Sequence, residues 1–456
     1  MSTGLELAPR IDLLEQLRDK LRQAWRQSHS TPLIRAEVAA PGLDAAAWLA
    51  AQSPGARGYW SDREQSFALA GIGRADWIIG QTPAELPSLL RELHERLDGS
   101  PQNIRYFGGF SFDPLAPLNE EWGAFGHYRF ILPRVEVITR DGHTVLACNA
   151  RREEAPQQVE TELAGVRFPA GPPAGTLPAL LSRTDAPPRD EWARRIGDAL
   201  GQIGEGSLRK VVLARRASLE CATPPDPAHL LLRLRARAVA AFHFCFQPDP
   251  HHAFVGASPE RLYRRDGSRL STEAIAGTRP RGATPEEDAR LCAALLDSEK
   301  DRREHAMVVE GIRSAVSPLL ADIHVEAEPR LLKLSHNQHL IVSIQGRLRD
   351  GVQDSDLLSA LHPTPAVGGL PTTEALDFLR RRENFSRGWY AAPIGWVSRD
   401  AAQFAVGIRS ALVSRKSLHL YSGAGIVSGS DPESEWAEIE NKIAHILDLF
   451  PHIPPA

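Results

Sequence analysis

Cysteine is scarce in this sequence, which has only Cys148, Cys221, Cys245 and Cys292 in a chain of 456 residues. The four are far apart, and their spacing matches no metal-binding cysteine motif. So few thiols in so long a chain argue against a disulfide framework and indicate a reducing cytoplasm.

Long hydrophobic runs are absent as well. No stretch approaches the roughly 20 consecutive apolar residues that a membrane-spanning helix needs. The start of the chain also lacks a basic segment followed by an apolar run, which is the pattern of a secretory signal. We therefore expect a cytoplasmic protein without a membrane partner.

An excess of positive charge is also missing. The chain has 53 Lys and Arg against 57 Asp and Glu, a formal net charge of −4. Duplex nucleic acid normally requires a clustered basic face, so this balance argues against a nucleic-acid partner. An anionic small substrate would have to be held by local cations, because the field of the whole protein does not attract it.

What is present is an ordinary globular composition, with 42% hydrophobic and 24% charged residues, and a chain long enough to bury a large core. Apolar residues recur at helical spacing over 11–28, and short apolar runs alternate with Gly and Pro turns over 31–150. The Pro-, Gly- and Ala-rich stretch 165–188 predicts a connector. We therefore divide the chain into residues 1–185, an N-terminal α/β portion of the same fold, and residues 186–456, which carry the candidate site.

Helices and groups of strands follow the connector. Helical spacing is found over 190–204 and 299–319, and the segments with strand character are 209–215, 253–264, 340–349, 391–398, 404–413 and 418–422. Strands grouped in runs with helices between them predict an α+β fold.

The most informative stretch is GAGIVSGSDPESEWAEIENK, residues 423–442. A Gly-rich turn is predicted to lead into a helix on which Glu435, Glu438 and Lys442 share one face, at spacings of three and four. Two neighbouring carboxylates repel each other unless a cation lies between them, and oxygen ligands suit Mg²⁺. Lys442, one turn further on, is placed to bind an anionic group held by the same ion.

Lys210 and Glu260 are candidates for proton transfer. Lys210 begins an apolar strand, and burial of its ammonium would favour the neutral form that a general base needs. Glu260 follows the Ser258–Pro259 turn, and an apolar pocket would keep its carboxyl protonated as a general acid. From the pattern alone, a Lys at a strand end with its head in water and an exposed Glu beside a turn are the favoured interpretations.

Several further residues have side chains or backbone suited to a metal-bound anion. Glu304, in the first turns of a charged helix, could add a third carboxylate to the metal site. Gly turns at Gly277–Thr278 and at Gly423 to Gly425 could present amides to an anion, or could serve only as tight turns. Arg409 and Tyr390, which belong to apolar strand-like segments, could bind a carboxylate or could be satisfied within the core.

Six strings, taken together and in order, resemble the chorismate-utilising enzyme family. They cover roughly residues 190–450 and are KVVLAR (210–215), GASPER (256–261), IAGT (275–278), SEKDRREH (298–305), LHPTPA (361–366) and GAGIV (423–427). The resemblance implies a large α+β fold with two antiparallel sheets packed face to face and helices outside. It also implies Mg²⁺ as the cofactor and chorismate as the small-molecule substrate.

Within that family the pattern resembles the isochorismate synthases. Anthranilate synthases typically have Gln where this chain has Lys210, and one type of aminodeoxychorismate synthase has a Lys nucleophile where this chain has Ala276. The resemblance implies no glutamine amidotransferase subunit, and nothing in the sequence requires a partner, so a monomer is expected. A salicylate synthase, which goes on to eliminate pyruvate, is the nearest alternative, and a non-catalytic chorismate-binding protein is a remote one.

The resemblance also assigns roles. It makes Lys210 the base that activates water for attack at C2 and Glu260 the acid that protonates the leaving C4 hydroxyl. Its metal ligands are Glu304, Glu435 and Glu438, and its substrate-binding residues are Gly277, Thr278, His362, Tyr390, Arg409, Gly423, Gly425 and Lys442. Because a neutral Lys in contact with a neutral Glu would take its proton, we expect no direct Lys210–Glu260 ion pair.

Overall fold

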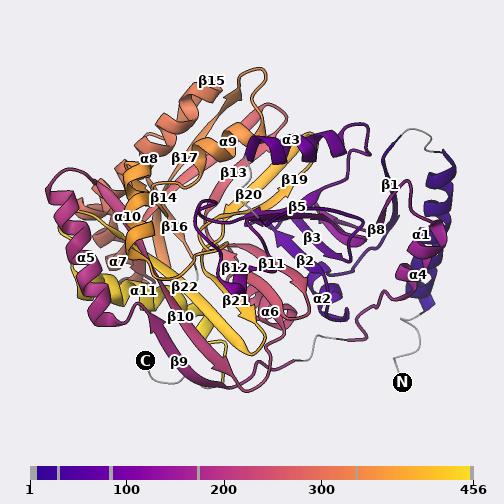
Figure 1. The fold of residues 1–456 in the computed structure, drawn as a ribbon, viewed down its shortest axis with the longest axis horizontal. Coiled ribbons are helices and arrows are strands. Elements are labelled where there is room, and N and C mark those ends of the chain that lie inside the picture. Colours follow the sequence, from indigo (N-terminus) through magenta and orange to yellow (C-terminus); the bar gives the residue numbers. More distant parts are fainter. Residues whose placement is uncertain (1–7, 28–30, 82–85, 172–174, 335–336, 452–456) are drawn as a thin grey trace.

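Two antiparallel sheets packed face to face form the protein, with helices on the outside (Figure 1). The structure is a computed structural model that describes residues 8–27, 31–81, 86–171, 175–334 and 337–451. The expected α+β class and two-sheet architecture are confirmed. Among the described residues, no helix is both long and apolar enough to cross a membrane.

The larger sheet has twelve strands. Its order is β1 (Leu33–Ala39), β8 (His143–Arg151), β7 (Val135–Arg140), β3 (Phe67–Ile72), β2 (Arg57–Ser61), β11 (Phe242–Asp249), β12 (His252–Ser258), β21 (Ser410–Ser414), β22 (Ser417–Ile426), β10 (Lys210–Cys221) and β18 (Gly369–Leu370), with β9 (Leu180–Ala186) also paired to β10. The stretch expected as a connector over 165–188 therefore ends in a strand.

The smaller sheet has ten strands. Its order is β15 (Leu320–Val325), β17 (Asn337–Leu348), β14 (Arg269–Pro280), β13 (Arg261–Asp266), β20 (Ala401–Val406), β19 (Pro393–Val397), β5 (Tyr106–Phe110), β6 (Tyr128–Leu132) and β4 (Asp76–Gly80), with β16 (Arg330–Lys333) also paired to β17. Both sheets join strands from before and after residue 185, because β2 pairs with β11 and β5 pairs with β19.

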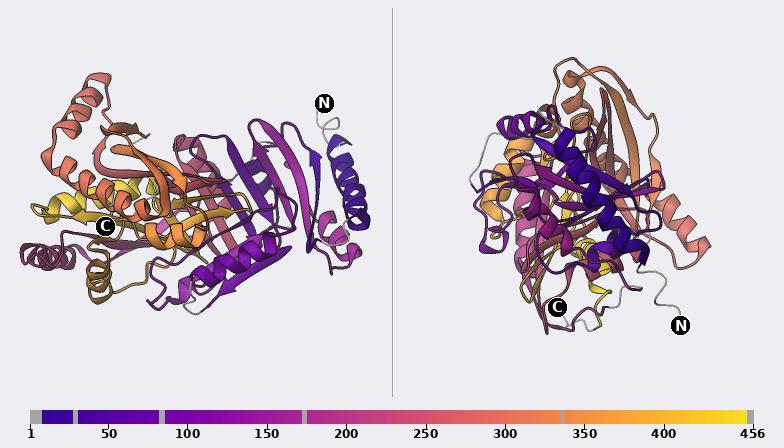
Figure 2. Two further views of the ribbon diagram at one scale, coloured as in Figure 1. Left: turned by 90° about the horizontal axis from the view of Figure 1, so that it is seen from above. Right: turned by 90° about the vertical axis from the view of Figure 1, so that its right-hand side faces the viewer.

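Helices cover the outer surfaces. They are α1 (Ala8–Gln27), α2 (Ala45–Ala50), α3 (Leu86–Leu97), α4 (Pro156–Ala164), α5 (Arg189–Gly204), α6 (Pro227–Arg237), α7 (Pro285–Asp297), α8 (Glu299–Val316), α9 (Asp354–Leu361), α10 (Thr372–Arg382) and α11 (Pro432–Leu447), with 3₁₀ turns at Glu120–Trp122 and Ser317–Leu319. Helices α1 and α4 lie together at one end of the elongated molecule (Figure 2).

Alternation along the strands divides the interior into two hydrophobic cores. In β11, Phe242, Phe244 and Phe246 enter the core between the sheets, whereas Cys245 faces the core beneath the outer helices. Successive side chains of a strand point to opposite faces, so one strand serves both cores.

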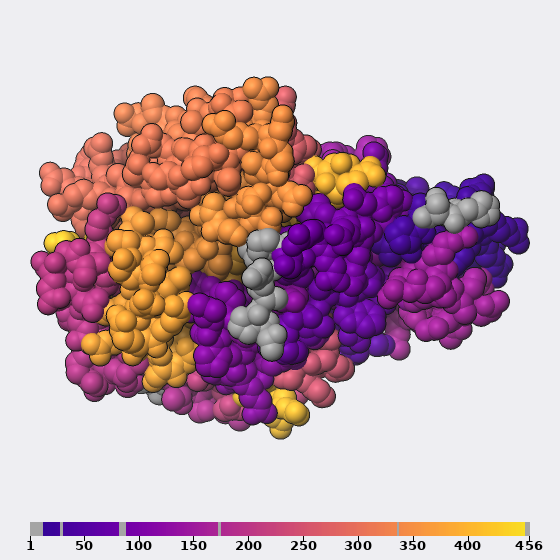
Figure 3. All heavy atoms as spheres, turned by 45° about the horizontal axis from the view of Figure 1, so that its top comes forward, coloured from indigo at the N-terminus to yellow at the C-terminus, as the bar shows by residue number. Residues whose placement is uncertain are grey.

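The N-terminal part also contacts the rest of the chain at the surface, where the purple and orange segments meet (Figure 3) and Arg380 pairs with Asp113.

The chain crosses between the sheets at two points that matter for the site. It passes from β12 to β13 through Pro259 and Glu260, and it returns from β20 to β21 through residues 407–409. The segment 404–413, expected as one strand, is thus broken, and Arg409 has a φ of 53° in the bend. A non-glycine residue rarely adopts this conformation.

Candidate active site

A cavity of about 480 Å³ lies where these crossings meet β10, β14, β22, α8 and α11. All but one of the residues selected from the sequence line it. They are Lys210, Glu260, Gly277, Thr278, Glu304, Tyr390, Arg409, Gly423, Gly425, Glu435, Glu438 and Lys442. The missing one is His362.

Lys210 is buried at the start of β10, with 1% of its surface exposed. Its Nζ donates a hydrogen bond to Glu304 Oε1 over 2.8 Å. Gly425 of the neighbouring strand β22, which pairs with Val212 of β10, leaves room for this contact. A Cβ atom at position 425 would lie 2.6 Å from Glu304 Oε1 and 3.0 Å from Lys210 Cε. The Lys head is therefore inside the protein rather than in water.

Glu260 occupies the crossing from β12 to β13 and is also buried. Burial, aided by the nearby negative charge of Glu273, raises the pKa of its carboxyl to about 8, although Lys210 and Lys442 oppose the shift. Among the described residues no cation forms an ion pair with this carboxyl, and Lys210 pairs with Glu304 instead. At neutral pH the Glu260 carboxyl therefore holds its proton.

The three carboxylates selected as metal ligands each accept a hydrogen bond from a lysine ammonium. The pairs are Glu304 with Lys210 at 2.8 Å, Glu435 with Lys300 at 3.0 Å, and Glu438 with Lys442. Lys300 was not selected from the sequence. Its place four residues before Glu304 in the same helix is a spacing that could have indicated it.

The donor set fits a hard divalent cation. Burial and the charge of Glu438 raise the pKa of Glu435, so the two neighbouring carboxylates require positive charge, which the lysines supply. Carboxylate oxygens are the ligands that Mg²⁺ prefers. Within the described ranges no group of three acidic, His or Cys side chains is arranged to hold a metal ion. Because each of the three carboxylates accepts a hydrogen bond from a lysine, a bound ion would have to displace these ammonium groups.

Arg409 and Tyr390 provide a polar wall of the cavity. Burial lowers the pKa of Arg409 to about 10, against the opposing charges of Glu438 and Tyr390, and its Nη1 donates to the Lys442 carbonyl. Tyr390 stacks on Tyr421 with ring centroids 5.2 Å apart. Burial also raises the pKa of the Tyr390 phenol, so this group is a hydrogen-bond donor at any physiological pH.

The two Gly segments are not the turns that the sequence suggested. Gly423 and Gly425 lie within β22, where they pair with Ala214 and Val212 of β10, and the Gly423 carbonyl accepts a hydrogen bond from Lys442 Nζ over 2.9 Å. Gly277, with a φ of 72°, occupies a bulge of β14. The bulge re-aims the strand toward the cavity.

His339 is a cavity residue that the sequence reasoning missed. Its Nδ1 lies 3.2 Å from the Gly277 carbonyl and 3.1 Å from Thr278 Oγ1. Burial lowers the pKa of the ring to about 3, and Nε2 has no hydrogen-bond partner among the described atoms. The residue falls at the start of β17, just outside the strand predicted over 340–349, and nothing in its local pattern distinguishes it.

The structure does not bring His362 to this cavity. Its Nε2 lies 2.9 Å from the Phe112 carbonyl, and its ring lines a separate cavity of about 300 Å³. Ala366, the last residue of the same string, and Val367, which follows it, do line the main cavity. Placing His362 in the substrate pocket is therefore not supported by the geometry.

Comparison with known proteins agrees with this arrangement. The family model described as "Chorismate binding enzyme" matches residues 19–450. The solved structure of MenF, the menaquinone-specific isochorismate synthase from Escherichia coli, aligns with a TM-score of 0.84 and 31% identity, covering 96% of this chain and 99% of that one.

Two curated relatives match over most of their length. Isochorismate synthase MenF from Bacillus subtilis is 33% identical over 87% of this chain and 88% of its own. A salicylate biosynthesis isochorismate synthase from Pseudomonas aeruginosa is 37% identical over 76% of this chain and 74% of its own. The range matched by the family model includes every strand of both sheets and every residue that lines the cavity. The chain therefore belongs to the family of chorismate binding enzymes.

Proposed function

We propose that the protein is an isochorismate synthase, an isomerase that converts chorismate to isochorismate. The observation that carries the proposal is the pair of groups in one cavity: a buried lysine, Lys210, and a carboxyl, Glu260, that is protonated at neutral pH and forms no ion pair with that lysine. The relatives named as isochorismate synthases support the same activity.

The two groups have complementary roles. Lys210, in its neutral form, takes a proton from water as the water oxygen bonds to C2 of the chorismate ring. The ring double bonds shift, and the C4–O bond breaks as Glu260 donates its proton, so that the C4 hydroxyl leaves as water. One water enters and one leaves, which balances an isomerisation.

The remaining residues of the cavity would hold the dianionic substrate. Arg409 and Tyr390, buried on one wall, are suited to the enolpyruvyl carboxylate, with the strand that carries Gly423 beside them. Lys442 is suited to the ring carboxylate. Because the protein has a net charge of −4, these local cations have to supply the attraction.

Glu304, Glu435 and Glu438 would hold Mg²⁺, which when bound supplies positive charge that neutralises and orients the ring carboxylate. The same carboxylates hold Lys210 and Lys442 in the structure.

The test is to incubate the purified protein with chorismate and Mg²⁺ and to separate the products by chromatography. We expect isochorismate alone, lost in the presence of EDTA and in Lys210→Ala. Salicylate with pyruvate would instead identify a salicylate synthase. Absence of turnover with Mg²⁺ would contradict both enzymatic assignments and favour a non-catalytic chorismate-binding protein.

We further propose a monomer in the cytoplasm that acts without an amidotransferase subunit. All four cysteines are buried and free, as expected of a protein kept in a reducing compartment. Light scattering on the purified protein measures the oligomeric state, and a dimer would contradict that part of the proposal.

A further inference from the structure

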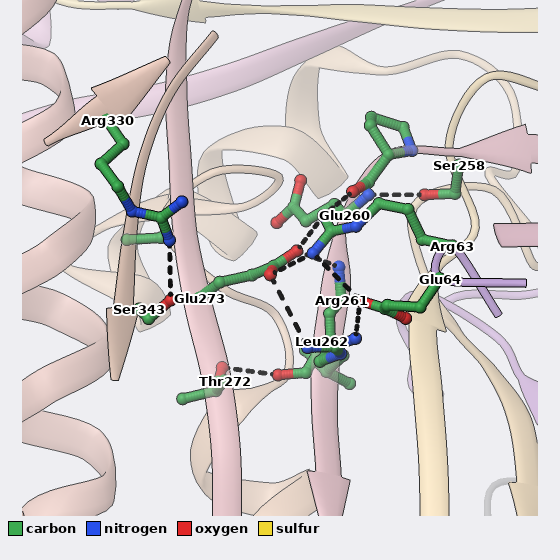
Figure 4. A network of polar contacts seen from close by, with 12 residues as sticks. Arg63, Glu64, Ser258, Glu260, Arg261, Leu262, Thr272, Glu273, Arg330 and Ser343 are labelled. Atoms are coloured by element: carbon green, nitrogen blue, oxygen red, sulfur yellow. Dashed lines mark hydrogen bonds and ion pairs between the residues drawn. The ribbon is translucent and has the colours of Figure 1, made fainter. Parts of the chain in front are cut away.

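Glu260 belongs to a turn whose backbone is held on all sides. Its own N–H donates to Ser258 Oγ over 3.2 Å, and its carbonyl accepts from the Val406 N–H over 3.0 Å. The peptide groups before and after it, the Pro259 carbonyl and the Arg261 N–H, are bound by two further side chains, Arg63 and Glu273. Figure 4 shows these side chains gathered around the turn.

Arg63 and Glu273 form a largely buried, two-pronged ion pair. Arg63 Nη1 and Nη2 donate to the two carboxylate oxygens of Glu273 over 2.7 and 2.8 Å. Nη1 also donates to the Pro259 carbonyl over 2.8 Å, and Glu273 Oε1 also accepts from the Arg261 N–H over 3.0 Å. The fork of a guanidinium fixes the orientation of both partners.

The Arg63 side chain is itself held in place. Its guanidinium lies 5.4 Å from the ring centre of Phe242, and that of Arg261 lies 5.5 Å from the same ring. Glu64, the next residue, accepts from Arg261 Nη2 over 2.6 Å. Arg63 and Glu64, in the hairpin between β2 and β3, thus hold in place the segment between β12 and β13 that contains Glu260.

We propose that Arg63 and Glu273 are positioning residues for the general acid: together they clamp the peptide groups on both sides of Glu260, and Glu273 holds a buried negative charge beside its carboxyl. The inference rests on the function proposed above, which makes Glu260 the proton donor. Neither residue lines the cavity among the described residues, so both act through Glu260 rather than on substrate.

The charge of Glu273 has a definite direction of effect. The groups that act on the Glu260 carboxyl are Glu273 on β14, Lys210 on β10, Lys442 on α11 and the phenol of Tyr390. Burial makes the largest contribution to the raised pKa of Glu260, and the charge of Glu273 raises this pKa further. The charges of the two lysines lower it. Removal of the Glu273 charge therefore shifts Glu260 toward its ionised form at neutral and alkaline pH.

The experiment titrates Glu260 directly in the full-length protein by infrared spectroscopy. The C=O band of the protonated carboxyl is assigned by its loss in Glu260→Gln. We expect this band to disappear near pH 8 in the native protein and roughly one pH unit lower in Glu273→Gln, a typical effect of one nearby charge. An unchanged midpoint in Glu273→Gln would overturn the proposal.

A second variant and a matched control separate positioning from general damage. Arg63→Lys keeps the charge but loses the fork, so kcat for chorismate should fall roughly tenfold with KM nearly unchanged. Asp354→Asn breaks a more deeply buried forked pair, with Arg265 at 2.8 and 2.9 Å, away from the cavity. It should lower stability without moving the Glu260 band or kcat.

The readouts also keep this inference distinct from the function on which it rests. The infrared titration needs no turnover, so a native protein inactive on chorismate would refute the proposed function and still report whether Glu273 governs Glu260. An active native protein whose Arg63→Lys variant raised KM alone, or whose Asp354→Asn control lost as much kcat, would contradict the positioning role.

Discussion

At the scale of single residues, the site depends on a position that has no side chain. Gly425 leaves the space in which Lys210 meets Glu304. In Gly425→Ala the new Cβ would approach Glu304 Oε1 to 2.6 Å, so the carboxylate and the Lys head must move apart. We expect kcat/KM to fall roughly hundredfold, the order of loss that a displacement of about 1 Å causes. Steady-state kinetics measures it.

Gly201→Ala is the control for that substitution. Gly201 lies in helix α5, where an added Cβ meets nothing within 4 Å. It should leave activity unchanged and stabilise the protein by about 0.5 to 1 kcal/mol, because Ala favours the helix. Full activity in Gly425→Ala would show that the close contact at β22 is not needed for turnover.

A second prediction concerns the cost of keeping Glu260 protonated. The folded pKa is about 8 against an ordinary value of 4.5, so the folded state binds the extra proton between these values. The resulting stability is complete below about pH 4.5 and is lost as pH rises through 8. Glu260→Gln should therefore be inactive yet more stable than the native protein at pH 8, by on the order of 2 kcal/mol.

Urea denaturation at pH 5 and pH 8 measures this difference. Glu374→Gln, at an exposed position of helix α10, serves as the control and should change neither value. If Glu260→Gln were no more stable than the native protein at pH 8, the carboxyl would not be held protonated in the fold.

Most catalytic candidates could be predicted from the sequence because they lie in short motifs whose order is itself informative. Lys210, Glu260 and the acidic residues of α8 and α11 were found in this way. Arg63 and Glu273 could not be found, since their contact joins positions 210 residues apart. The string that contains His362 was recognised, but which of its residues faces the cavity depends on how the loop packs.

At the scale of elements, helix α11 carries much of the site and is attached to the larger sheet through Glu440. This residue accepts hydrogen bonds from Arg215 on β10 and from Arg183 on β9. Arg215 is fully buried, and its guanidinium lies 4.6 Å from the ring centre of Trp436. The attachment holds Glu435, Glu438 and Lys442 in register with the cavity.

Glu440→Gln should lower the free energy of unfolding by about 2 kcal/mol, because buried Arg215 loses its charged partner. It should also raise the Mg²⁺ concentration that half-saturates activity. Glu433→Gln is the matched control on the same helix, since its pair with Arg189 is exposed and worth well under 1 kcal/mol. Urea denaturation and a Mg²⁺ titration of activity measure both effects, and equal losses in the two variants would contradict this role of Glu440.

Element boundaries were hardest to predict where the chain changes sheets. An apolar run such as 404–413 has the composition of one long strand, and only the packing of the two sheets requires the bend at Arg409. The glycines at 423 and 425 suggested a turn, whereas close approach of Lys210, Glu304 and Tyr390 explains them within a strand. Both errors arise because tertiary contacts override local propensity.

At the scale of the whole molecule, buried neutral histidines should make the protein sensitive to acid. Burial lowers the pKa to about 3 in His339 and to about 4 in His243, His362 and His419. The unfolded chain binds these protons near pH 6.5, so stability present above that pH is lost as pH falls toward 4. His94, whose pKa is raised through its hydrogen bond to Asp354, and the protonated carboxyl of Glu260 oppose the trend.

We expect each buried ring to contribute up to about 1.4 kcal/mol per pH unit over that window. Denaturation at pH 7, 6 and 5 measures the slope, and His419→Gln should make it shallower by one proton. Other titrating groups, Glu260 among them, are shared by both proteins and cancel in the comparison. An unchanged slope in His419→Gln would therefore mean that the ring is already charged in the folded state.

Both sheets contain strands from each half of the chain, and this determines what happens when the chain is divided into two pieces. A chain divided before β9 would leave β11 without β2 and β19 without β5, and each piece would expose long unpaired strand edges that invite aggregation. Neither piece should be soluble when produced alone. Produced together, the two pieces have complementary strand edges and a shared core, so we expect them to reassemble. Reassembly would restore the ion pair between Arg63 and Glu273, and recovery of enzymatic turnover would show that the two pieces have associated.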